Sequence, residues 1–214
     1  MKQKVLLITS LISLVLFFLI LLASYNNLEG IDFFVNSNVI HIQNNNLTSI
    51  FSFISYLFEP LNMILISFLI SLILLVAKQR EQALFFALTM TVGGIFIYIL
   101  KGLVMKTRPL NGIIIETGYS FPSGHSLISI LFFGLIILYF SNKKSSNLVT
   151  PTCILAIALV SFDRLYLNVH WLSDVLGGLF LGGFLLFLSL YLFNIYKTKS
   201  NPLNHKYTKN LHHH

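Results

Sequence analysis

The stretch LSDVLGGLFLGGFLLFLSLYLFNIY (residues 172–196) determines what kind of protein this chain is. After Asp174 it carries no charged residue, and as a helix it is long enough to cross a bilayer, which takes about 20 residues. The rest of the chain agrees, because 56% of its 214 residues are hydrophobic and only 10% are charged. A soluble domain carries about 25% charged residues. Lipid is therefore the solvent for most of this chain.

Five further apolar stretches are long enough, or nearly so, to cross the hydrocarbon core. The sequence thus predicts an all-α integral membrane protein with six transmembrane helices. The first apolar run exceeds the hydrophobic region of a signal peptide and is not followed by a convincing cleavage site, so we expect an anchor. We place the six spans at about Val5–Ala23, Leu61–Ala77, Ala83–Val104, Ser126–Phe140, Thr150–Leu167 and Leu172–Tyr196.

A single domain is expected over residues 1–200, followed by a polar tail over residues 201–214. The tail ends in Leu211-His212-His213-His214, which resembles the start of a purification tag. The single cysteine, Cys153, lies in an apolar run, so we expect it to pack in the core and neither a disulfide nor a thiolate metal site to form. The sequence leaves the oligomeric state open.

The basic residues predict the orientation in the cell membrane. If both termini are cytoplasmic, ten of the fourteen Lys and Arg residues fall on the inner side, as the positive-inside rule requires. These ten are Lys2, Lys4, Lys78, Arg80, Lys143, Lys144, Lys197, Lys199, Lys206 and Lys209. The other four lie at helix ends on the outer side, where an unpaired charge is costly; they are Lys101, Lys106, Arg108 and Arg164. We expect an anionic partner on that extracytoplasmic face, and no nucleic acid.

The outer segment Ser24–Pro60 is long for a connection. Within it, apolar residues recur at helical spacing from Ile50 to Phe58, after Thr48-Ser49 as a plausible N-cap. The pattern predicts a short helix lying in the membrane interface. Such a helix either covers the bundle or guides lipid substrates toward it.

Three polar clusters fall on the predicted outer side. Lys101-Gly-Leu-Val-Met-Lys-Thr-Arg108-Pro109 follows the third span, Phe121-Pro-Ser-Gly-His125 precedes the fourth, and Arg164-Leu-Tyr-Leu-Asn-Val-His170-Trp-Leu-Ser-Asp174 joins the fifth to the sixth. Since the topology is set by charges elsewhere in the chain, their shared side is an independent indication that they act together. We expect one site built from all three clusters.

The residue types in these clusters suit a phosphate group. Lys101, Arg108 and Arg164 supply positive charge, and guanidinium groups match phosphate oxygens in pairs. Ser123 offers a hydroxyl group, and Gly124 lets backbone N–H groups approach an anion at a helix N-terminus. Lys106 either joins this cluster or only extends toward the interface.

The two histidines suit phosphoryl transfer. His170 and Asp174 are four residues apart, so on a helix they share a face, and the carboxylate can fix the imidazole tautomer for nucleophilic attack. His125 is then the natural proton donor to the leaving oxygen. We expect no metal and no other cofactor, because most of the outer acids are far in sequence from the histidines: Glu29, Asp32, Glu59, Glu116, Asp163 and Asp174.

Lys-x6-Arg-Pro, Pro-Ser-Gly-His and Arg-x5-His-x3-Asp, in this order, resemble the three signature motifs of the type 2 phosphatidic acid phosphatase family. The resemblance implies a six-helix core, metal-independent hydrolysis through a phosphohistidine, and lipid phosphates or polyprenyl diphosphates as substrates. It implies that Lys101, Arg108, Ser123, Gly124 and Arg164 bind phosphate, with His170 as nucleophile, His125 as general acid and Asp174 as the partner of His170.

One residue departs from the family pattern. Asp163 stands where the family usually has serine, and it either orients Arg164 by pairing or weakens the local anion field.

Several substrates and activities remain open on the sequence. Phosphatidylglycerol phosphate, undecaprenyl diphosphate and phosphatidic acid are the candidate lipids, and a short chain of bacterial layout favours the first two. A lipid phosphotransferase with the same intermediate is the main alternative. A non-catalytic anion or lipid transporter is a further one, although binding alone does not require an oriented His-Asp pair. A vanadium haloperoxidase ranks last, because such an oxidase needs no lipid-embedded body.

Overall fold

The computed structural model describes residues 3–25, 28–140 and 146–200. Over these residues the chain is helical, without strands. The helices are α1 Gln3–Ala23, α2 Glu29–Val39, a 3-10 turn Ile40–Ile42, α3 Asn45–Leu57, α4 Pro60–Val76, α5 Arg80–Val104, α6 Gly124–Phe140, α7 Ser146–Tyr166 and α8 Leu172–Ser200. Each of the six expected apolar stretches is a helix, with ends within about four residues of those read from the sequence.

The protein is an integral multi-pass membrane protein. Four of its helices, α1, α5, α7 and α8, are long and apolar enough to cross a bilayer. The helices α3 and α4, taken together, are also long and apolar enough for one span, with a bend of 45° between them. The helix α6 is apolar but only 17 residues long.

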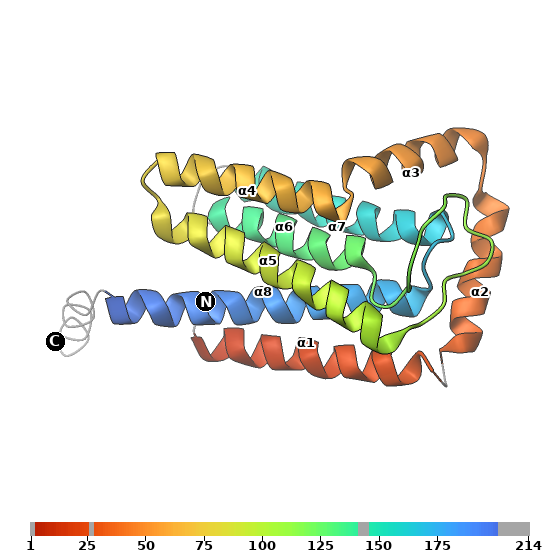
Figure 1. Cartoon of the computed structure of the whole chain (residues 1–214), viewed down its shortest axis with the longest axis horizontal. Helices are drawn as coiled ribbons and strands as arrows, with labels where there is room; N and C mark the ends of the chain where they lie inside the picture. Colours follow the sequence, from red (N-terminus) through yellow and green to blue (C-terminus); the bar gives the residue numbers. More distant parts are fainter. Residues whose placement is uncertain (1–2, 26–27, 141–145, 201–214) are drawn as a thin grey trace.

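The helix α6 forms the centre of the bundle. It packs against α4, α5, α7 and α8, and α1 completes the bundle by packing along α8 (Figure 1). Glycines allow these close approaches. A Cβ atom on Gly178 would lie 2.5 Å from the backbone oxygen of Ser123, and one on Gly182 would lie 2.9 Å from that of Leu127. Cys153 is buried in the core, as expected.

The helices alternate in direction, so that their ends separate into two groups (Figure 1). The starts of α1, α5 and α7 and the end of α8 lie at one end of the bundle, at the left in the figure. The opposite end holds the C-termini of α5 and α7, the N-termini of α6 and α8, the loop 105–123 and both outer helices, α2 and α3.

The basic residues divide in the same way. Lys4, Lys78, Arg80, Lys197 and Lys199 belong to the first end. Lys2, Lys143, Lys144, Lys206 and Lys209, together with the tail 201–214, lie outside the described residues.

The outer connection differs from its prediction in two respects. The expected helix is present as α3, but its N-cap is Asn44, whose side chain accepts a hydrogen bond of 3.0 Å from the Leu47 amide, and not Thr48-Ser49. The second outer helix, α2, was not anticipated. Its sequence EGIDFFVNSNV carries two acids and three polar residues, and it lacks the run of helical apolar spacing on which the α3 prediction depended.

Candidate active site

The three predicted clusters converge at one end of the bundle, although up to 73 positions separate Lys101 from Asp174 in the chain. Lys101 lies in the last turn of α5, Ser123 precedes α6, Arg164 lies in the last turn of α7 and Asp174 in the first turn of α8. Arg108 and His170 lie in the loops between these helices.

His170 is held between an acid and a guanidinium group. Its Nδ1 lies 3.2 Å from Asp174 Oδ2, and its Nε2 lies 3.2 Å from Arg108 Nη1. Because a guanidinium group can only donate, Nε2 must accept, so the proton is on Nδ1 and is donated to Asp174. Asp174 Oδ2 also accepts the Trp171 amide at 2.9 Å, which fixes the carboxylate. The imidazole therefore presents a lone pair on Nε2.

Burial and charge keep this imidazole neutral. Burial is the main cause that lowers the pKa of His170 well below its ordinary value of 6.5, and the positive charges of Arg108, Lys101 and Arg164 lower it further. A neutral imidazole is the form that can attack phosphorus.

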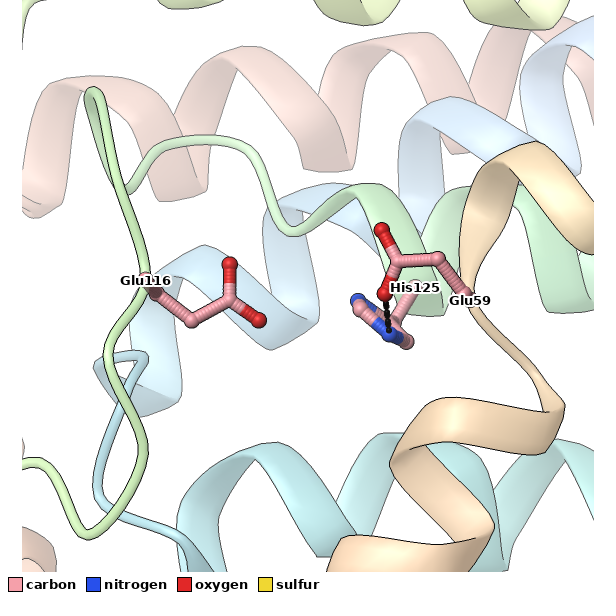
Figure 2. Close-up of side chains that lie close together, drawn as sticks. All are labelled: Glu59, Glu116 and His125. Atoms are coloured by element: carbon pink, nitrogen blue, oxygen red, sulfur yellow. Dashed lines mark ion pairs between the residues drawn. The ribbon is translucent and has the colours of Figure 1, made fainter.

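His125 faces the same space from the first turn of α6. Its Nδ1 lies 3.4 Å from Arg164 Nη1, and its Nε2 lies 3.2 Å from Glu59 Oε2 (Figure 2). The contact with Glu59 is one of proximity only, because His125 Nε2 is buried and has no hydrogen-bond partner among the described residues. The contact with His125 is the main cause that lowers the pKa of Glu59, against the opposing effect of burial.

Both arginines are anchored by groups of the protein. Arg108 donates from Nε to Gly118 O at 3.1 Å and from Nη1 to Val169 O at 2.9 Å. Burial lowers the pKa of Arg108 from its ordinary value, and the nearby charge of Glu116 opposes this shift. Arg164 is fully buried and its Nε contacts Asp163. Of the two roles considered for Asp163, pairing with the arginine is the one observed.

Glu116 occupies the position between the two guanidinium groups. Its Oε1 lies 3.0 Å from Arg164 Nη1, and its Oε2 lies 3.4 Å from Arg108 Nη2. Arg164 Nη2 is buried and has no hydrogen-bond partner among the described residues. A carboxylate bridging two arginines occupies the kind of position that a phosphate group can also take, because both anions accept paired hydrogen bonds from guanidinium groups.

The other predicted phosphate-binding residues lie at the same end of the bundle. Ser123 is buried, and its hydroxyl group lies 3.2 Å from that of Ser126. Gly124 is the first residue of α6, so its amide belongs to the N–H groups that lack an intrahelical acceptor. Lys101 donates from Nζ to Tyr119 O, and thereby ties α5 to the loop 105–123.

Lys106 does not extend into the interface. Its Nζ lies 2.6 Å from Ser173 Oγ, 3.0 Å from Asp32 Oδ2 and 3.4 Å from Asp174 Oδ1. Of the two alternatives that the sequence left open, Lys106 therefore joins the polar cluster, where it contacts Asp174.

The sequence did not predict that Glu59 and Glu116 lie close to His125, or that Asp32 lies close to Asp174. All three acids were assigned to the outer side, but sequence distance gave no sign that they approach the histidines. Glu116 lies nine positions before His125, in the loop that leads into α6, and this is the one local signal available.

Glu59, Glu116 and His125 could by distance hold a metal ion, because one donor atom from each lies within 4.8 Å of the others (Figure 2). The surrounding charges oppose it. Both Glu116 oxygens face arginines, and Arg164 approaches His125 as well, so a cation would have to displace two guanidinium groups. The cluster is chemically better suited to an anion, and a metal-free site remains our prediction.

The chain is similar to several known proteins. The sequence profile of the PAP2 superfamily matches residues 82–197, which include all three clusters. Phosphatidylglycerophosphatase B of Bacillus subtilis (strain 168) is 29% identical over 192 residues, 83% of this chain and 91% of that protein. An undecaprenyl-diphosphatase of Sulfolobus acidocaldarius is 29% identical over 127 residues, 56% of this chain and 59% of that protein.

A solved structure has the same fold. The crystal structure of a transmembrane PAP2 type phosphatidylglycerolphosphate phosphatase from Bacillus subtilis aligns with a TM-score of 0.77 and 24% identity. The alignment covers 85% of this chain and 94% of that one.

Proposed function

The chain belongs to the PAP2 superfamily, and from this premise we propose that it is a membrane lipid phosphatase that works through a phosphohistidine on His170. The observation that carries the proposal is the position of His170 Nε2, a lone pair 3.2 Å from Arg108 and beside the place that Glu116 holds between two arginines. A phosphate group bound to these arginines in place of Glu116 has its phosphorus next to the nucleophile.

The reaction proceeds in two steps. His170 Nε2 forms a bond to phosphorus while the bond from phosphorus to the lipid oxygen breaks, and His125 gives its proton to that oxygen. Asp174 stabilises the positive charge that develops on His170, and the two arginines stabilise the phosphoryl oxygens. Water then attacks phosphorus, His125 takes its proton, and inorganic phosphate leaves His170 free.

The substrate is a lipid that carries a phosphomonoester or a diphosphate. Phosphatidylglycerol phosphate and undecaprenyl diphosphate are the first candidates, supported by the names of the two curated relatives, and phosphatidic acid is the third. We place six spans in the cell membrane, formed by α1, α4, α5, α6, α7 and α8. Both termini are cytoplasmic, and the site opens to the extracytoplasmic leaflet, where the head group meets the arginines and the tail stays in lipid.

The test is phosphate release by the purified protein from a panel of these three lipids in mixed micelles. His170→Ala should abolish release, whereas His41→Ala, which removes an exposed histidine of the outer connection, should leave it unchanged. Protein quenched in alkaline detergent after incubation with radiolabelled substrate should carry acid-labile, alkali-stable phosphate on His170. Release by the His170→Ala protein at the parental rate would contradict the mechanism. Transfer of the label to a second lipid without free phosphate would assign a phosphotransferase instead.

A further inference from the structure

The outer helix α2 contacts the residues on either side of the proposed nucleophile, His170. Asp32, near its start, is 3% exposed, and its carboxylate accepts the Ser173 amide at 2.8 Å and the Ser173 hydroxyl group at 2.6 Å. Ser173 lies in the first turn of α8, immediately before Asp174. Asp32 therefore supplies an acceptor for an N-terminal amide of α8 from a position 141 residues away. It lies outside the residues that the superfamily profile matches.

Lys106 links the same carboxylate to the site. From Asp32 Oδ2 the contacts run to Lys106 Nζ at 3.0 Å, from there to Asp174 Oδ1 at 3.4 Å, and from Asp174 Oδ2 to His170 Nδ1 at 3.2 Å. The Lys106 side chain is 14% exposed, and the two carboxylates are almost completely buried. In such surroundings a charge interacts strongly with its neighbours.

A second contact of α2 lies on the other side of His170. Asn36, four residues after Asp32 and so on the same helix face, donates from Nδ2 to the side chain of Asn168. Asn168 has a left-handed backbone with φ of 59°, which asparagine adopts more readily than most residues. The helix α2 thus contacts Asn168, two residues before the nucleophile, and Ser173, three residues after it.

We propose that Asp32 and Lys106 form a positioning pair that fixes the orientation of Asp174 and balances its charge, and so controls the protonation of His170. This inference rests on the proposed function, because it takes His170 as the nucleophile. Neither residue of the pair contacts the place between the arginines, so they act on the reaction through Asp174. The charged groups that face the His170–Asp174 unit from the other elements are Lys101 of α5, Arg108 and Glu116 of the loop 105–123, His125 of α6 and Arg164 of α7, with Glu59 beside His125.

The pair makes opposite predictions for its two members. Asp32→Asn leaves Lys106 without its counter-charge, which adds positive charge beside His170 and opposes its protonation. Lys106→Gln removes positive charge and favours protonation. The double variant loses one charge of each sign, so the two effects cancel. Asparagine can still accept the Ser173 amide through its oxygen, so the first variant retains the anchor of α8.

The experiment measures kcat, KM and the acid limb of kcat/KM for the purified protein with a lipid phosphate. We expect the limb to move to lower pH in Asp32→Asn and to higher pH in Lys106→Gln, by about half a unit or more, and to return near the parental position in the double variant. Each single variant should lose kcat several-fold with little change in KM. The matched control is Glu29→Gln, which removes the same charge from an exposed position of the same helix and should behave as the parent.

A second readout does not depend on turnover. Diethyl pyrocarbonate reacts with an imidazole only when the ring is neutral. Mass spectrometry of the His170 peptide gives the rate of His170 modification at each pH, and the pH at which this rate falls should shift in the same directions as the acid limb. Unshifted limbs and modification rates in folded Asp32→Asn would overturn the positioning role, as would shifts of the same sign in both single variants. If the parent protein released no phosphate from any lipid, the proposed function would fail, while the modification profile would still test the pair. If Lys106→Gln failed to fold, the comparison of the acid limbs of Asp32→Asn and Glu29→Gln would decide whether Asp32 has the positioning role.

Discussion

Replacement of Asp174 by asparagine tests the central contact of the site, because the structure leaves the amide no favourable orientation. If its oxygen takes the place of Oδ2, it accepts the Trp171 amide and the His170 Nδ1–H, but its NH₂ group then faces Lys106 Nζ at about the present 3.4 Å, donor against donor. If the amide turns over, its NH₂ group faces Trp171 N–H and forces the His170 proton onto Nε2. The nucleophilic lone pair is then lost.

The magnitude follows from the charge that develops on His170. As Nε2 bonds to phosphorus the imidazole becomes positive, and the Asp174 carboxylate is its counter-charge at 3.2 Å in a buried site. Breaking a buried pair of this kind costs about 3–5 kcal/mol. Since 1.36 kcal/mol corresponds to a factor of ten, kcat should fall by about 10²–10⁴-fold. The same change of the acid in a serine protease triad lowers kcat by about 10⁴-fold, at the upper end of this range.

The assay is the initial rate of phosphate release at saturating lipid, with binding of vanadate measured in parallel. Vanadate binding should persist, because both arginines are unchanged. The control is Glu81→Gln, a partly exposed acid that pairs with Lys197 at 3.6 Å at the opposite end of the bundle, and it should retain parental activity. A kcat for Asp174→Asn within threefold of the parent would refute the assigned role of the carboxylate.

Four further outcomes are expected. Because burial lowers the pKa of His170, the imidazole of the folded protein stays neutral and active below pH 6.5, whereas in the unfolded chain it binds a proton near pH 6.5. The free energy of unfolding should therefore decrease as the pH is lowered below this value, as a denaturation series across pH would measure. Gly178→Ala places a Cβ atom 2.5 Å from Ser123 O, so thermal unfolding in detergent should show a loss of about 1–3 kcal/mol and lower activity, whereas Gly30→Ala, with open space around it, should show neither. Glu116→Gln removes the carboxylate that competes for both guanidinium groups, so vanadate should bind about threefold to tenfold more tightly; weaker binding would contradict that competition. Activity should survive excess EDTA, and a loss reversed by added Mg²⁺ would reject the metal-free site.

The helices of the bundle could be predicted because each is specified locally. A run such as Leu172–Tyr196 is apolar over its whole length, and neither packing nor neighbours can change its preference for lipid. The helix α2 was missed because it is short and polar on one face, so its formation depends on contacts of Asp32 and Asn36 with distant residues. The N-cap of α3 was misplaced by four residues for a related reason, since several polar residues precede Ile50 and only the folded chain selects Asn44.

Composition, the positive-inside pattern and the order of the three clusters determined, from the sequence alone, that this is a helical membrane protein of one superfamily with a candidate site at a single end. The tertiary structure decided which acids take part. Glu59 and Asp32 are far in sequence from the histidines, and Glu116, nine positions before His125, lies in a loop whose path the sequence does not reveal. The physical reason is that apolar character and helical period are properties of a segment, whereas an ion pair exists only once the bundle has brought its two charges within a few ångströms of each other.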